Sequence, residues 1–249
     1  MESLPPPVSL LDALAAVFAA SGVDPRAWAL GFARSMPAVT LVPAFGLAGV
    51  PPPARVALGL ALGFCLAPAL SASVTPGGPL LVALAREALV GLPVALLAAS
   101  AVYAASMAGG LIDDLRGARE STTLPVLPEG APSVSVLFAM LTAVAFLQSG
   151  GAARVASTLA APQLAARFSW PAVATALAAS IEVAFAIAAP LAVAAVLLEL
   201  GGALVARAAT PAFIGPVLAP LRSVALLAVL ALVFERVAEL LALLAAAAP

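Results

Sequence analysis

The sequence predicts an all-α, polytopic membrane protein, and its composition is the first reason. Of the 249 residues, 64% are hydrophobic, 9% are charged, and the mean hydropathy is +1.17. Soluble domains carry about 25% charged residues. A soluble domain of this size could not hide so much apolar surface from water. The composition therefore excludes a soluble enzyme, a nucleic-acid-binding domain and a disordered linker, and we treat residues 1–249 as a single integral-membrane domain.

The second reason is the length of the apolar segments, because a helix that crosses a bilayer needs about 20 mostly apolar residues. Three segments contain no charge: residues 56–74, 88–112 and 130–153. Four more contain isolated charges: residues 8–23, 27–50, 170–198 and 221–248. We expect six or seven helices, with the first and the last two as candidates for hairpin elements rather than simple spans.

The third reason is the placement of proline and arginine. The chain has 23 prolines, and four of them interrupt apolar runs: Pro43, Pro68, Pro93 and Pro190. A proline removes a backbone donor and kinks a helix, and a broken helix in a membrane needs neighbouring protein or a cavity to satisfy it. Arginines occur in nearly every connection, which leaves no asymmetry from which to assign orientation. Kinked helices packed in a larger assembly are therefore expected.

Residues that carry chemistry are scarce. There is no histidine and no lysine, and the single cysteine, Cys65, excludes an internal disulfide and a cysteine zinc cluster. We interpret Cys65 as a small buried hydrophobic residue. No phosphate-binding loop, nucleophile elbow, zinc-protease motif or dinucleotide fingerprint is present. The sequence predicts neither a cofactor, nor a metal site, nor an enzyme.

A polar segment follows the cleanest apolar helix. Six of the 23 charged residues fall between positions 113 and 129. Asp113 and Asp114 come at the carboxyl end of the predicted helix, where they oppose its dipole, so Arg116 or Arg119 is expected to compensate them. Two interpretations stay open: a solvated loop with local ion pairs, or a loop that projects into a conduit or an interface.

Glu182 and Glu199 are isolated acids in apolar sequence, which makes them candidates for function. They are 17 positions apart and so lie on different faces of a straight helix. We favour their pairing with Arg207, Arg167 or an arginine of a neighbouring subunit, with a proton relay or a simple place at an interface as the alternatives. Gly59 and Gly63 match the GxxxG helix-contact pattern.

Several of these motifs together resemble a known family. The most specific is the run from Ala108 to Gly117, which places Gly109, Gly110, Asp113, Asp114, Arg116 and Gly117 at a helix end before a proline-containing polar loop. The runs Arg34 to Pro37 and Arg86 to Pro93 add to it. In these residues the chain resembles the FliR/SctT/SpaR family of the type III export gate. Gly150–Gly151 and Ser169–Trp170–Pro171 are more similar to the injectisome branch than to the flagellar branch.

The resemblance implies a function and an assembly. It implies one subunit of a helical hetero-oligomeric gate that passes unfolded secreted proteins through the bacterial inner membrane, within the secretion basal body. The implied partners are FliP/SctR-type and FliQ/SctS-type membrane subunits, with FlhB/SctU-type and FlhA/SctV-type proteins beside them, and no nucleic acid. A pore plug is implied within residues 116–133, with these candidates: Arg116, Gly117, Arg119, Glu120, Ser121, Thr122, Thr123, Leu124, Pro125, Pro128 and Ser133.

One competing function comes from another class. A proton- or ion-coupled secondary transporter could use Glu182 and Glu199 beside proline-broken helices, but the chain shows no internal repeat of the kind such transporters have. An intramembrane enzyme would need a nucleophile and a base, and none are paired in the sequence. The first basic residue is Arg26. Because a signal peptide begins with a positive region, we expect no cleaved signal peptide.

Overall fold

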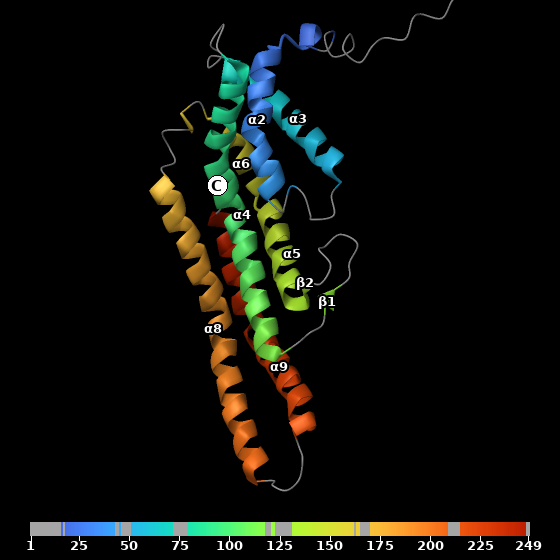
Figure 1. Ribbon diagram of the computed structural model, residues 1–249, viewed down its shortest axis with the longest axis vertical. Helices are drawn as coiled ribbons and strands as arrows, with labels where there is room; N and C mark the ends of the chain where they lie inside the picture. The colour runs from blue at the N-terminus through green and yellow to red at the C-terminus, as the bar shows by residue number, and fades with distance from the viewer. Residues whose placement is uncertain are drawn as a thin grey trace, which may run out of the picture.

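The computed structural model describes residues 16, 18–42, 45, 51–71, 79–117, 121–122, 131–161, 163–164, 170–208 and 215–247. Across these residues the fold is all-α apart from one two-residue β-ladder, which confirms the predicted class (Figure 1). The long elements are α2 (Pro25–Leu41), α3 (Pro52–Leu70), α4 (Leu80–Arg116), α5 (Ser133–Gln148), α6 (Gly151–Leu159), α8 (Trp170–Ala208) and α9 (Gly215–Ala247). The ladder pairs β1 (Ser121–Thr122) with β2 (Ala131–Pro132).

Three helices, α3, α4 and α8, are long and apolar enough to cross a membrane, and α5 with α6 would make a fourth if the bent pair is one span. The chain is therefore a polytopic membrane protein. Seven long helices lie in the described part of the chain, which agrees with the six or seven expected, but α2 and α9 are not among the candidate spans. Helix α2 has only 17 residues.

Helix α4 is the central element of the elongated molecule and extends the predicted segment 88–112 at both ends. It packs against α2, α5, α8 and α9 (Figure 1). Small side chains cover its buried face, which lets four neighbours approach one helix. The helix ends at Gly117, which has φ +67° and donates its N–H to the carbonyl of Asp114. A left-handed glycine at this place is the usual way to stop an α-helix.

Two hydrophobic cores lie along α4. One is formed by α2, α3, α6 and the amino-terminal half of α4, with Phe146 of α5 and Ala245 of α9 inserted into it. The other is formed by the carboxyl-terminal half of α4 with α5, α8 and α9, around Ile112, Phe138 and Leu191. The two halves of the molecule are thus joined by one continuous helix.

Glycines allow the closest helix crossings. A Cβ atom placed on Gly63 of α3 would lie 2.6 Å from the backbone nitrogen of Phe32 on α2. A Cβ atom on Gly91 of α4 would overlap the carbonyl oxygen of Arg34, also on α2. Both contacts are with backbone, which cannot rotate away, so neither position has room for a side chain. The GxxxG match that includes Gly63 therefore marks a real crossing of α2 and α3.

Cys65 is exposed, so its interpretation as a buried residue was wrong. Helix α3 packs on α2 along one narrow stripe that includes Gly59, Gly63, Leu66 and Leu70. At 100° per residue Cys65 falls on the other side of the helix. Hydrophobic character alone could not indicate which face of an all-apolar helix would be covered.

A pronounced bend occurs away from the prolines. Pro68, Pro93 and Pro190 lie inside α3, α4 and α8, and Pro43 lies outside the described residues. A bend of 66° instead separates α5 from α6, at Ser149–Gly150, where Gly150 has φ +75°. The predicted segment 130–153 is therefore two helices that meet at a left-handed glycine.

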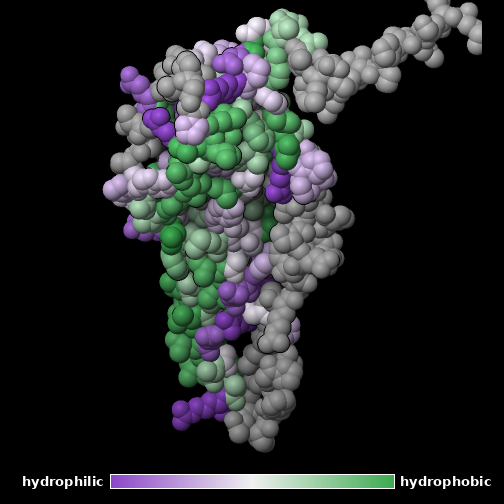
Figure 2. Space-filling model, turned by 45° about the horizontal axis from the view of Figure 1, so that its top comes forward, coloured by the Kyte–Doolittle hydropathy of each residue, from purple (hydrophilic) through white to green (hydrophobic). Residues whose placement is uncertain are grey.

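Apolar side chains also cover much of the outside. On the face that Figure 2 shows, hydrophobic residues run along most of the length of the molecule, while hydrophilic residues gather in patches. The large exposed side chains of α8 and α9 include Phe185, Val193, Leu197, Leu204, Val224, Leu232 and Leu243. Such a surface needs lipid or other protein around it.

Candidate functional site

A buried polar cluster lies where α4 ends and α5 begins, and Asp113 is its centre. The Asp113 side chain is 3% exposed, and its Oδ1 atom accepts a hydrogen bond from Arg116 Nη1 at 2.8 Å. Its Oδ2 atom accepts from the backbone N–H of Val134 at 2.8 Å and from that of Ser135 at 3.4 Å. The compensating ion pair expected for Asp113 is thus present, with Arg116 as partner.

The first turn of α5 explains why a carboxylate is needed there. The first N–H groups of a helix have no partner within the helix, and a side chain at the N-cap usually accepts from the second or third of them. The N-cap of α5 is Pro132, which makes no such bond. Asp113 takes that role from another helix, since Val134 and Ser135 are the second and third residues of α5. Its negative charge also suits the positive end of the α5 dipole.

The two helices touch closely beside this cluster. A Cβ atom on Gly109 of α4 would lie 2.5 Å from the Cα atom of Ser135. The hydroxyl of Ser135 donates to the carbonyl of Ser106 on α4 at 2.8 Å. Gly109, which the family motif singled out, is therefore the residue that lets α5 approach α4 near Asp113.

Arg116 connects the cluster to a third helix. Its Nε atom donates to the hydroxyl of Ser223 on α9 at 3.4 Å, and its side chain is 5% exposed. Arg116 also lies in the last turn of α4, where a positive charge favours the helix dipole. The Asp113–Arg116 pair thus joins the carboxyl end of α4 to the amino end of α5 and to the third turn of α9.

The plug candidates divide into helix ends, ladder residues and residues outside the description. Arg116 is the last residue of α4, Gly117 is its cap, and Ser133 is the first residue of α5. Ser121 pairs with Pro132 and Thr122 pairs with Ala131 in the β1–β2 ladder. Six candidates lie outside the described residues: Arg119, Glu120, Thr123, Leu124, Pro125 and Pro128. The plug role remains a prediction.

Of the other motif residues, Asp114 is exposed, and a Cβ atom on Gly110 would meet nothing within 4 Å.

A second buried ion pair was missed by the sequence analysis. Arg34 Nε on α2 donates to Glu87 Oε2 on α4 at 2.7 Å, and Arg34 Nη1 donates to the carbonyl of Leu159 at 3.0 Å. The two side chains are 4% and 9% exposed. Leu159 is the last residue of α6, so Arg34 also sits at the negative end of the α6 dipole. The available signal was an arginine inside the apolar segment 27–50 and a glutamate directly before the apolar segment 88–112.

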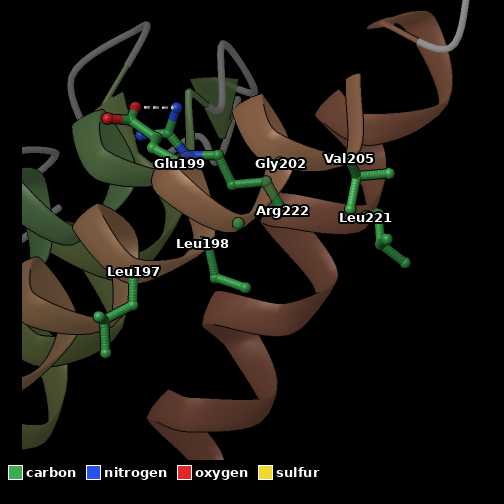
Figure 3. Close-up of a pocket in the computed structure, with 8 residues that line it drawn as sticks. Leu197, Leu198, Glu199, Gly202, Val205, Leu221 and Arg222 are labelled. Carbon is green, nitrogen blue, oxygen red and sulfur yellow. Dashed lines mark ion pairs between the residues drawn. The ribbon is translucent and has the colours of Figure 1, made fainter. Parts of the chain in front are cut away.

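Glu199 pairs with Arg222 of α9, not with Arg207 (Figure 3). The Glu199 Oε1 and Arg222 Nη1 atoms are 2.5 Å apart, and the Glu199 side chain is 55% exposed. The pair lies at the rim of a hollow of about 410 Å³ between α8 and α9, with Leu197, Leu198, Val205 and Leu221 among its walls.

Glu182 is exposed on α8 and makes no ion pair among the described residues. The structure therefore does not bring Glu182 and Glu199 together. In the same described part of the chain, no group of three or more metal-binding side chains lies close enough to hold an ion.

These ion pairs and hydrogen bonds hold helices together across the described part of the chain. The sequence pattern of the family described as bacterial export proteins, family 1, matches residues 26–247. The chain belongs to this family. The family is the FliR/SctT family of type III export proteins. No curated protein matches the chain in a sequence comparison.

Membership in this FliR/SctT family makes the protein a bacterial export-apparatus protein of type III secretion and a membrane protein. The matched region contains both buried ion pairs and all seven long helices except the first residue of α2. The family is one of secretion-apparatus membrane components.

Proposed function

We propose that the protein is a subunit of the type III export gate in the bacterial inner membrane, within the secretion basal body. It forms the conduit for unfolded substrate proteins with FliP/SctR-type and FliQ/SctS-type subunits, and it lies beside FlhB/SctU-type and FlhA/SctV-type proteins. The observation that carries this proposal is the family match over residues 26–247.

The length of the apolar helices supports an assembly with other proteins. Helix α8 has 39 residues, which at 1.5 Å per residue is about 58 Å. The hydrocarbon core of a bilayer is about 30 Å thick. Exposed large apolar side chains extend from Trp170 to Val205 on α8, about 53 Å at 1.5 Å per residue. Lipid covers only part of such a length when the helices stand upright, so other subunits cover the rest.

The segment between α4 and α5 is the proposed plug. Its support is that α4 and α5 are held together at the two points where this segment leaves and returns, through Asp113 and the β1–β2 ladder. A segment anchored at both ends can be displaced by a passing substrate without unfolding the helices. Deleting residues 120–128 from the assembled gate should raise ion leakage through proteoliposomes that contain it. Leakage equal to that of the unmodified gate would contradict the plug.

We assign the protein to the injectisome branch, and Gly150–Gly151 supports this assignment. The flagellar branch usually carries histidine at the second of these positions, and a Cβ atom on Gly151 would lie 2.5 Å from the ring of Phe146, which leaves little room for a larger side chain. Complementation distinguishes the branches: the gene should restore secretion to an injectisome strain that lacks its own subunit, and motility to no flagellar strain. The opposite pattern would reverse the assignment.

A further inference from the structure

The contacts of Asp113 suggest more than helix capping. One carboxylate binds a cation of its own helix through one oxygen and the first turn of the next helix through the other. The same side chain therefore contacts residues on both sides of the segment 117–132: Arg116 before it and Val134 after it. The neighbouring Asp114 is exposed and takes no part.

We infer that Asp113 is a positioning residue that fixes α5 against α4 in the non-conducting state of the gate, an inference that rests on the proposed function. Arg116 extends the tie to Ser223 of α9. Gly109 and Ser135 hold the same two helices at backbone contact on the adjacent turn. Once Asp113 is removed, the start of α5 keeps its apolar contacts but loses its only charged connection to α4 among the described residues.

A local N-cap would satisfy the amides of Val134 and Ser135 but would not tie α5 to α4. This difference separates positioning from simple helix stability. The N-cap position is Pro132, so the double variant Asp113→Ala/Pro132→Asp supplies the carboxylate from α5 itself. Asp is among the best residues at that position.

The experiment uses the full chain, purified with both small partner subunits and placed in proteoliposomes. It compares five forms: wild type, Asp113→Ala, Asp113→Asn, the double variant, and Asp114→Ala as the matched control. Two quantities are measured in each: ion leakage, and hydrogen exchange at the amides of Val134 and Ser135. Asp113→Asn keeps an acceptor for the amides and removes the charge that binds Arg116. It replaces Asp113→Ala in the leakage comparison if Asp113→Ala fails to assemble.

We expect Asp113→Ala to raise leakage and amide exchange about tenfold each, a factor that corresponds to about 1.4 kcal/mol. Asp113→Asn should raise both by a smaller factor, and Asp114→Ala should change neither. The double variant should restore slow exchange but keep the raised leakage. Unchanged leakage in both single Asp113 variants would overturn the inference. So would a double variant that restores low leakage, because capping alone would then be sufficient.

Failure of the proposed function gives a different result. If the wild-type chain does not assemble with the two partners, no leakage comparison is made and the proposed function is wrong. Hydrogen exchange in the chain alone then still tests the tie itself: equal exchange at Val134 and Ser135 in wild type and Asp113→Ala would show that Asp113 does not hold α5.

Discussion

Replacing Glu87 by alanine should strongly destabilise the assembled protein. The Arg34 and Glu87 side chains are 4% and 9% exposed, so the change leaves a guanidinium buried without its carboxylate. Breaking a buried ion pair by removing one partner costs about 3–5 kcal/mol. In a chain of this size about 1 kcal/mol shifts the midpoint of thermal unfolding by roughly 2–4 °C. The expected decrease in the midpoint is therefore on the order of 10 °C.

The assay heats the purified complex in detergent and follows the fraction that stays assembled by size-exclusion chromatography. Glu182→Ala is the matched control, because Glu182 is exposed and unpaired among the described residues; its midpoint should stay within the small range of surface substitutions. The double variant Arg34→Met/Glu87→Met should lower the midpoint less than Glu87→Ala does, since removing both charges leaves no buried ion at this site. Equal midpoints for Glu87→Ala and Glu182→Ala would refute the reasoning.

Five other substitutions test the helix contacts and the transporter alternative. Gly91→Ala should lower the free energy of unfolding by at least about 1–3 kcal/mol, because the new Cβ would meet the backbone of α2. Gly110→Ala, with open space around it, should leave that free energy unchanged or raise it by about 0.5–1 kcal/mol. Equal thermal midpoints for the two variants would contradict both expectations. Arg154→Ala should cost about 1.5 kcal/mol, because Arg154 donates to carbonyls at the ends of α5 and α9, and hydrogen exchange in those last turns should accelerate locally. Glu182→Gln and Glu199→Gln should leave protein secretion unchanged, since both acids are exposed and far from each other on α8. Loss of coupled ion flux in either variant would favour the secondary transporter.

The sequence predicted the helical class well because that class depends on composition and segment length. The predicted segment 88–112 became the core of α4, and the break in 130–153 came at a glycine pair that was noted for another reason. A partner for Asp113, either Arg116 or Arg119, was expected because an acid at the carboxyl end of a helix opposes the helix dipole. The partner found, Arg116, is only three positions away, so the relation is local.

Contacts between distant segments could not be predicted in the same way. The pairing of Arg34 with Glu87 joins residues 53 positions apart, and the choice of Arg222 over Arg207 depends on how α8 and α9 lie side by side. The buried face of an entirely apolar helix is also undetermined by hydropathy, which is why Cys65 was placed wrongly. Small residues such as Gly91 decide these contacts, and their role is visible only when the partner backbone is known.

The most direct test of the central claim is native mass spectrometry after co-expression with the FliP/SctR-type and FliQ/SctS-type subunits of the same host. A tag on this chain alone selects the complexes that contain it. The account predicts a discrete particle with one copy of this chain and several copies of each partner. A monomer or a homo-oligomer that contains neither partner would contradict it.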